Sequence, residues 1–84
     1  MQKVKVISLN VNGIRAAKKK GLIEWIVLQD PDYVCLQETR AQKKDLDLSF
    51  FNIALNNSCL KGTYFFSMKP GYSGVAIFSQ KQPT

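Results

Sequence analysis

Glu38 and Asn10 are the residues whose type and position in this sequence could do chemistry. Glu38 follows an apolar run at residues 33–36, and Asn10 follows a β-branched run at residues 4–9. A carboxylate just beyond the carboxyl end of a buried strand lies where α/β sheets place their binding crevices. Carboxylate and amide oxygens suit Mg²⁺ or Mn²⁺, which prefer oxygen donors and keep waters for a phosphate substrate. We therefore treat both residues as candidate catalytic residues at a metal site, with Glu38 as a metal ligand and Asn10 able to hold a catalytic water, a metal-bound ligand or a phosphate oxygen.

Each candidate also has a plainer interpretation. Most glutamates are exposed to solvent, so Glu38 could be an ordinary loop residue. Asn10 could open the next loop as an Asx turn, and the pair Asn12 and Gly13 is a turn signal of the same kind. If the two strands are parallel neighbours, however, Asn10 and Glu38 lie at the same edge of the sheet, within reach of one ion.

A basic cluster, Arg15 with Lys18, Lys19 and Lys20, precedes the helical pattern that begins at Leu22. Lysines at the start of a helix oppose its dipole, and a bound anion would offset this effect. A phosphate backbone is the natural candidate, and a solvated helix face is the alternative. The net charge of +6, from 12 basic and 6 acidic residues, also favours a polyanionic partner, such as nucleic acid or an anionic membrane.

An aromatic ring and a hydroxyl stand between two glycines at residues 71–74, beside Lys69. Glycines permit close backbone approach, so Tyr72 could press against a nucleotide while Ser73 meets a phosphate. The alternative is a tight hairpin turn in which Tyr72 covers its own strands.

The elements that position these residues follow from periodicity. Strands are expected at residues 4–9, 33–36, 63–67 and 75–79, a helix from residue 22 to Pro31, and either a helix or a strand at residues 48–55. Strand, helix and strand within about thirty residues predict a parallel βαβ crossover. The unbroken apolar run at residues 33–36 predicts a strand covered on both faces, and Trp25 is expected to anchor the core. The class is α/β.

Composition excludes several classes. The 84 residues allow one domain at most, and no apolar run approaches the ~20 residues of a membrane helix. No signal peptide is apparent, so a soluble, intracellular protein is expected. The chain has no histidine, which excludes a histidine-based triad and the usual zinc sites, and Cys35 and Cys59 are expected to be free thiols. The last strand looks central, so open sheet edges would remain, and residues 1–84 are interpreted as the opening part of a larger domain.

Three blocks resemble one family. They are Ser-Leu-Asn-Val-Asn-Gly-Ile-Arg-Ala at residues 8–16, Pro-Asp-Tyr-Val-Cys-Leu-Gln-Glu-Thr-Arg at residues 31–40 and Gly-Tyr-Ser-Gly-Val-Ala at residues 71–76. With the Lys-Lys-Lys-Gly stretch, they resemble the exonuclease III and apurinic/apyrimidinic endonuclease family, within the endonuclease/exonuclease/phosphatase superfamily. The resemblance covers nearly the whole chain, and its first two blocks are long and specific.

The resemblance implies a fold and an activity. The fold is a four-layered α/β sandwich of the DNase I type, of which residues 1–84 would be the N-terminal part. The activity is hydrolysis of the DNA phosphodiester 5′ to an abasic site, with 3′→5′ exonuclease and 3′-phosphatase activity, using Mg²⁺ or Mn²⁺. The partner would be double-stranded DNA with abasic sites or 3′ ends. A full-length member would be a monomer, located with the DNA in the bacterial cytoplasm or the eukaryotic nucleus.

The resemblance also implies roles for individual residues. Glu38 would be the metal carboxylate, and Asn10 would lie in the metal and phosphate site. Asn12 occupies a position where some members carry aspartate. The residues expected to contact DNA are Asn12, Arg15, Ala16 and Lys19 along the backbone and Gly71, Tyr72 and Ser73 near the lesion.

The chain departs from the family in length. Members are several times longer, and their later portion supplies the water-positioning residues and an aspartate–histidine pair. Hydrolysis requires the nucleophile, the ion and the charge-stabilising donors together, so the 84 residues alone are expected to be inactive. The alternatives are a basic DNA-binding remnant without catalysis, and a phosphoesterase of the same superfamily that acts on another substrate, such as a phosphoinositide.

Overall fold

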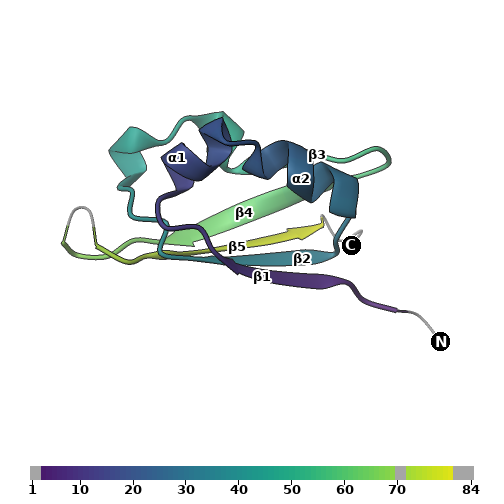
Figure 1. Ribbon diagram of the computed structural model, residues 1–84, viewed down its shortest axis with the longest axis horizontal. Helices are drawn as coiled ribbons and strands as arrows, with labels where there is room; N and C mark the ends of the chain where they lie inside the picture. The colour runs from purple at the N-terminus through teal and green to yellow at the C-terminus, as the bar shows by residue number, and fades with distance from the viewer. Residues whose placement is uncertain (1–2, 70–71, 81–84) are drawn as a thin grey trace.

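One mixed sheet of five strands runs the length of the molecule, in the order β1-β2-β5-β4-β3 (Figure 1). The computed structural model describes residues 3–69 and 72–80. The strands are β1 (Val6–Asn10), β2 (Tyr33–Gln37), β3 (Asn52–Ala54), β4 (Cys59–Phe65) and β5 (Val75–Gln80). The helices are α1 (Ile14–Lys19) and α2 (Leu22–Gln29), with 3₁₀ turns η1 (Lys43–Asp45) and η2 (Leu48–Phe50).

The predicted crossover is confirmed. β1 and β2 are parallel neighbours, with Ile7 opposite Val34 and Asn10 opposite Gln37. β5 pairs antiparallel with both β2 and β4, so the last strand of the pattern is central, as expected. The segment at residues 48–55, for which helix and strand were both open, contains η2 followed by β3.

The helices cover one face of the sheet, where the core lies (Figure 1). Val34 and Leu36 of β2 alternate toward this face and are almost fully buried, as are Ala76 and Phe78 of β5. Ile26 contributes the fully buried side chain of α2. Asp30, in a left-handed conformation with φ 49°, ends α2 directly before Pro31.

The opposite face of the sheet carries exposed apolar side chains among the described residues. Val6 is 62% exposed, Tyr33 40%, Phe65 58% and Ile77 44%. The prediction that β2 is covered on both faces is therefore wrong for residues 3–69 and 72–80, because Tyr33 and Cys35 alternate away from the helices. Cys35 and Cys59 are free thiols, as expected.

The basic cluster forms a helix of its own, which corrects the interpretation that it lies at the start of the next helix. Lys18 and Lys19 are in the last turn of α1, where the negative end of the helix dipole favours cations. Gly21, with φ 102°, separates α1 from α2. Trp25 is 41% exposed instead of anchoring the core, because Leu22 and Ile26 occupy the inward positions.

The helices within residues 3–69 and 72–80 include none with the length and hydropathy needed to cross a bilayer.

Candidate functional site

The ends of β1 and β2 bring Asn10 and Glu38 together, as the sequence predicted. Because Asn10 pairs with Gln37 in the parallel register, the residue after Gln37 emerges at the same sheet edge. The Asn10 side-chain nitrogen, Nδ2, donates a hydrogen bond to Oε2 of Glu38 at 2.6 Å. Two residues 28 positions apart therefore form one polar site.

The orientation of the Asn10 amide is fixed by its two partners. Its oxygen, Oδ1, accepts a hydrogen bond from the backbone N–H of Asn12 at 2.9 Å. A backbone N–H can only donate and an ionised carboxylate can only accept, so the nitrogen must face Glu38. The Asx turn considered as the plainer interpretation is therefore present, and it also aims the Asn10 donor at Glu38.

Arg40 holds the other oxygen of Glu38. Its Nη2 donates to Oε1 at 2.7 Å, and the two side chains are 46% and 37% exposed. The hydrogen bond from Arg40, followed by that from Asn10, lowers the pKa of Glu38 below its ordinary value. Glu38 is therefore a carboxylate at neutral pH, with both oxygens accepting hydrogen bonds.

Backbone hydrogen bonds fix the loop that carries Glu38 against the start of α1. The N–H of Gly13 donates to the carbonyl of Glu38, and the N–H of Ile14 donates to that of Thr39, both at 2.8 Å. The loop after β1 and the loop after β2 are therefore joined by backbone hydrogen bonds.

The segment before β5 clamps the same loop from the other side. The N–H of Thr39 donates to the carbonyl of Gly74 at 3.1 Å, and that of Arg40 to the carbonyl of Ser73 at 2.7 Å. Thr39 is 1% exposed, and its hydroxyl oxygen is buried without a hydrogen-bond partner. A Cβ added at Gly74 would lie 2.7 Å from that oxygen, so only glycine fits there without displacement.

Residues with left-handed backbone gather at this edge. Such conformations are uncommon outside glycine and tend to cluster at functional sites. Four of the five non-glycine examples among the described residues belong to these three loops: Asn12, Glu38, Arg40 and Ser73. Hydrogen bonds between these loops hold the residues with left-handed backbone in their uncommon conformations.

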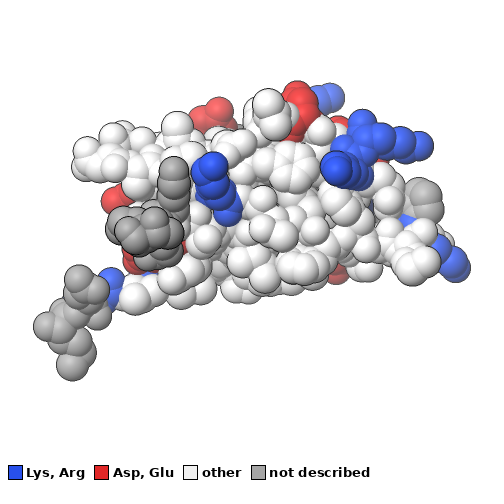
Figure 2. Space-filling view, turned by 180° about the vertical axis from the view of Figure 1, so that it is seen from behind, with Lys and Arg blue, Asp and Glu red and all other residues white. Residues whose placement is uncertain are grey.

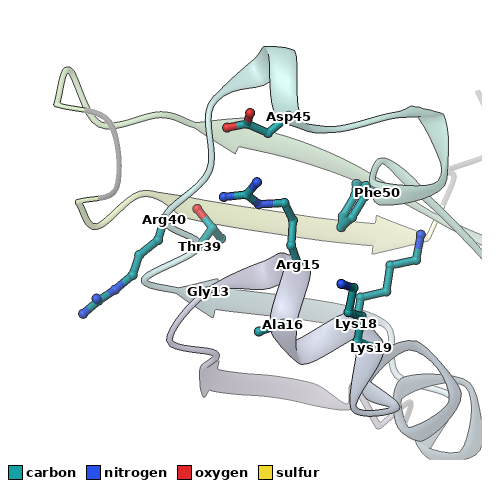
Figure 3. A pocket seen from close by; sticks show the side chains of 9 residues that line it. All are labelled: Gly13, Arg15, Ala16, Lys18, Lys19, Thr39, Arg40, Asp45 and Phe50. Atoms are coloured by element: carbon teal, nitrogen blue, oxygen red, sulfur yellow. The ribbon is translucent and has the colours of Figure 1, made fainter.

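A basic pocket of about 840 Å³ adjoins Arg40 on the helix side (Figure 3). The guanidinium of Arg15 extends into it between Thr39 and Asp45, whereas Arg40 points away from Arg15. Four cationic side chains line it against one carboxylate. The lining residues are Gly13, Arg15, Ala16, Lys18, Lys19, Thr39, Arg40, Asp45 and Phe50. This surface is suited to a polyanion, and it is called the basic pocket below.

Three of the residues expected to contact DNA, Arg15, Ala16 and Lys19, line the basic pocket together. Asn12 lies outside it and lines a second pocket, of about 520 Å³, with Asn10. Seen from behind, most visible Lys and Arg side chains lie toward the end of the molecule that carries α1 and the 3₁₀ turns (Figure 2).

The third block that resembles the family, residues 71–76, is described from Tyr72 onward. Tyr72 is 62% exposed, with the Lys69 ammonium 5.4 Å from its ring centre, and Ser73 contacts Arg40 through its carbonyl. Gly71 lies outside the described residues. The structure therefore joins Ser73 to the Glu38 loop through the backbone.

Sequence reasoning gave no role to Arg40, Thr39 or Phe50. The Lys18 ammonium lies 4.2 Å from the ring centre of Phe50, which forms one wall of the basic pocket. The one local signal was the Glu-Thr-Arg spacing, which places opposite charges two residues apart. The contact between Lys18 and Phe50 joins distant segments and leaves no such signal.

The residues present fit a divalent cation as a partial ligand set. Among residues 3–69 and 72–80, no group of three or more His, Cys, Asp or Glu side chains could enclose a metal ion. Glu38 supplies one half-exposed carboxylate, whereas Asn10 turns its amide nitrogen to Glu38 and its oxygen to the N–H of Asn12. Mg²⁺ usually takes one or two carboxylates and keeps several waters, so Glu38 suits a hydrated ion.

Known proteins resemble this chain closely. It is 36% identical to an exodeoxyribonuclease of Bacillus subtilis (strain 168), over 95% of this chain and 29% of that protein. It is 36% identical to the DNA repair nuclease APEX1 of Danio rerio, over 95% of this chain and 25% of that protein. The chain thus spans less than a third of the relatives it matches.

Solved structures share the fold. An AP endonuclease from Archaeoglobus fulgidus superposes with a TM-score of 0.71 at 26% identity, over 96% of this chain and 29% of that one. The APE2 catalytic domain of Xenopus laevis gives a TM-score of 0.68 at 37% identity, over 92% of this chain and 23% of that one. The expected α/β class, within the DNase I-like fold of these neighbours, is confirmed.

Residues 7–84 match the Endonuclease/Exonuclease/phosphatase family. The match includes the Glu38 loop, the basic pocket and the central strand β5. This chain belongs to the Endonuclease/Exonuclease/phosphatase family.

Proposed function

We propose that this chain is part of a metal-dependent DNA-repair nuclease of the exonuclease III type. The observation that carries the proposal is the ionised Glu38, oriented by Asn10 at a sheet edge beside the basic pocket. Relatives named as an exodeoxyribonuclease and a DNA repair nuclease support the reaction class. The reaction would be hydrolysis of the phosphodiester 5′ to an abasic site, with 3′→5′ exonuclease activity.

Glu38 would hold Mg²⁺ or Mn²⁺, with Asn10 beside it. Such an ion polarises a phosphoryl oxygen and offsets the charge that develops on it. Asn10 keeps the carboxylate in one orientation through its amide nitrogen. Arg15, Lys18 and Lys19 neutralise phosphates along the basic pocket, while Tyr72 and Ser73 contact the DNA near the lesion.

The 84 residues alone are proposed to bind DNA without hydrolysing it. Neither Glu38 nor Asn10 would serve as the general base, because Asn10 is a neutral amide and Glu38 is proposed to hold the ion. Positioning of a nucleophile must come from other residues of a full-length enzyme. That enzyme would act as a monomer on double-stranded DNA with abasic sites or 3′ ends, in the bacterial cytoplasm with the nucleoid or in the nucleus.

Two measurements on the purified chain test this proposal. Fluorescence anisotropy with a labelled abasic duplex should show binding at low salt that weakens steeply as salt rises. Incubation of the same duplex with Mg²⁺ should give no multiple-turnover incision. Absence of binding at low salt would contradict the DNA assignment, and repeated incision would contradict the proposed inactivity.

A metal-binding measurement separates this proposal from a DNA-binding module without a metal site. Mn²⁺ binding, followed by the electron paramagnetic resonance signal of the free ion, should be present in the unaltered chain. It should be lost in Glu38→Gln, which is nearly isosteric but lacks the charge. Equal Mn²⁺ binding by both chains would refute the assignment of Glu38 as a ligand.

A further inference from the structure

We propose that Arg40 is a positioning residue that occupies Oε1 of Glu38 until a divalent cation displaces it. Its freed guanidinium then binds the substrate phosphate beside the ion. This inference rests on the proposed function, because it takes Glu38 as the metal carboxylate. It assigns a specific exchange of partners to a residue for which the sequence suggested no role.

The two side chains that donate hydrogen bonds to Glu38 differ in how strongly a cation bound to Glu38 would repel them. Asn10 donates to Oε2 through a neutral amide, whereas Arg40 donates to Oε1 with a full positive charge. A divalent ion on the carboxylate repels the guanidinium but has only a weak interaction with the amide dipole. The ion therefore replaces Arg40 and leaves the contact with Asn10 intact.

The backbone holds Arg40 in place while its side chain can leave. Glu38 and Arg40 have φ values of 55° and 54°, and the N–H of Arg40 is tied to the carbonyl of Ser73 at 2.7 Å. The Arg40 side chain is 46% exposed, so it can rotate without displacing the core. Exposed ion pairs contribute little free energy, which makes the exchange easy.

Arg40 borders the basic pocket, while its guanidinium lies outside the pocket on Glu38. Arg15 extends into the basic pocket, whereas the side chain of Arg40 starts beside Thr39 and points away from Arg15, so a freed Arg40 could reach a phosphate at the edge of the pocket (Figure 3). A guanidinium presents two parallel N–H groups that match two phosphate oxygens. Arg40 is thus next to Glu38 and able to contact a phosphate that also binds the ion.

Without a cation the charges of Arg40 and Glu38 balance, and with a divalent cation the site carries a net positive charge that attracts phosphate. Without a cation, the single positive charge of Arg40 offsets the single negative charge of Glu38. With a divalent cation, the ion and Arg40 carry three positive charges, which Glu38 and the substrate phosphate partly neutralise. The proposal therefore predicts that removal of Arg40 has opposite effects on cation binding and on phosphate binding.

The test compares Arg40→Gln, Arg40→Lys and Glu38→Gln with the unaltered chain. The control is Arg15→Gln, which removes one charge from the basic pocket without touching Glu38. Mn²⁺ alone is the first probe, and a short abasic duplex with and without Mg²⁺ is the second. Arg40→Gln should bind Mn²⁺ roughly two- to five-fold more tightly, the range expected when a weak exposed competitor is lost.

The same variant should bind the duplex more weakly, and the loss should be larger with Mg²⁺ than without it. Arg15→Gln should weaken duplex binding equally in both conditions and change Mn²⁺ affinity little. Arg40→Lys should fall between the unaltered chain and Arg40→Gln in both measurements. A purely structural role for Arg40 would weaken both kinds of binding, so opposite changes are diagnostic.

A second readout needs no variant of Arg40. The ¹⁵N resonance of its Nε should shift during a Mg²⁺ titration of the unaltered chain and stay fixed in Glu38→Gln. If Glu38→Gln abolishes Mn²⁺ binding but Arg40→Gln leaves it unchanged or weaker, the exchange is refuted and the metal site stands. If Glu38→Gln binds Mn²⁺ normally, the proposed site fails, and this inference fails with it. Should Arg40→Gln not fold, an unmoved Arg40 resonance in the unaltered chain refutes the exchange.

Discussion

The amide nitrogen of Asn10 lies 2.6 Å from Oε2 of Glu38, while the amide oxygen of Asn10 is held by the N–H of Asn12. Asn10 therefore acts toward Glu38 as a hydrogen-bond donor. Together with Arg40, it lowers the pKa of Glu38. A carboxyl group whose pKa is lowered on folding stabilises the fold above its unfolded pKa. That contribution is lost as pH falls through the folded pKa.

Asn10→Ala should raise the pKa of Glu38, because the carboxylate loses a donor. Asn10→Asp should raise it further, because a second carboxylate would face the first at hydrogen-bonding distance. Carbon-detected NMR titration of the Glu38 side chain measures both shifts. In Asn10→Ala, the difference in unfolding free energy between neutral and acidic pH should be smaller than in the unaltered chain. An unchanged Glu38 pKa in both variants would contradict the donor role of Asn10.

Gly74→Ala should destabilise the chain more than Gly21→Ala. Both glycines have positive φ, 98° and 102°, so each alanine meets about 1–2 kcal/mol of backbone strain. At Gly74 the new Cβ also lies 2.7 Å from the Thr39 hydroxyl, whereas at Gly21 the nearest atom lies at 4.0 Å. Overpacking of this kind costs a further ~1–3 kcal/mol. The midpoints of urea denaturation compare the two variants directly.

Thr39→Ala tests whether the Thr39 hydroxyl causes the extra destabilisation expected in Gly74→Ala. The Thr39 hydroxyl is buried without a partner, so its removal alone should cost little. Combined with Gly74→Ala, it should recover most of the excess destabilisation and leave only the backbone strain. Equal losses in Gly74→Ala and Gly21→Ala, or no recovery in the double variant, would show that the contact with Thr39 does not restrict Gly74.

The sequence predicted the parts of the fold that depend on local pattern. Strands β1, β2 and β5 followed from short β-branched and apolar runs, and the meeting of Asn10 with Glu38 followed from the parallel crossover. The separate helix α1 was missed because the turn at Gly21 leaves the basic and apolar segments adjacent in sequence. A cluster of Lys and Arg residues in the sequence does not by itself show where one helix ends and the next begins.

Other features depend on contacts between distant segments. The fit between Gly74 and Thr39 and the placement of Lys18 over Phe50 each join loops far apart in the chain. Residue type at either position gives no indication of the partner. Trp25 was expected to anchor the core from the helix. Its position on the helix surface turns it partly to solvent, and Ile26 is the fully buried side chain of α2.

Gly62→Ala should destabilise the centre of the sheet. Gly62 lies opposite Phe78 in the β4–β5 ladder, and a Cβ there would lie 2.4 Å from the Phe78 ring. Phe78 is 1% exposed and packs edge-on against Tyr64, so the ring cannot move aside freely. The loss should be about 1–3 kcal/mol, measured by chemical denaturation.

The double variant Gly62→Ala with Phe78→Leu separates steric conflict from the intrinsic effect of alanine. Leucine at residue 78 is smaller than the ring, so the added methyl group should be tolerated better in this background than in the presence of Phe78. If Gly62→Ala costs as much beside leucine as beside phenylalanine, the ring contact is not the cause.

Arg15→Gln and Lys19→Gln should each reduce the salt dependence of DNA binding. Both side chains line the basic pocket, and each phosphate contact contributes about one unit to the slope of log affinity against log salt. The control is Lys61→Gln. Lys61 follows the fully buried Leu60 on β4, so it points to the sheet face opposite α1. Anisotropy titrations over a range of salt concentrations should give a smaller slope for the first two variants and an unchanged slope for Lys61→Gln. Equal slopes for all three would contradict a DNA contact at the basic pocket, because a diffuse attraction to the +6 net charge would not distinguish one face from the other.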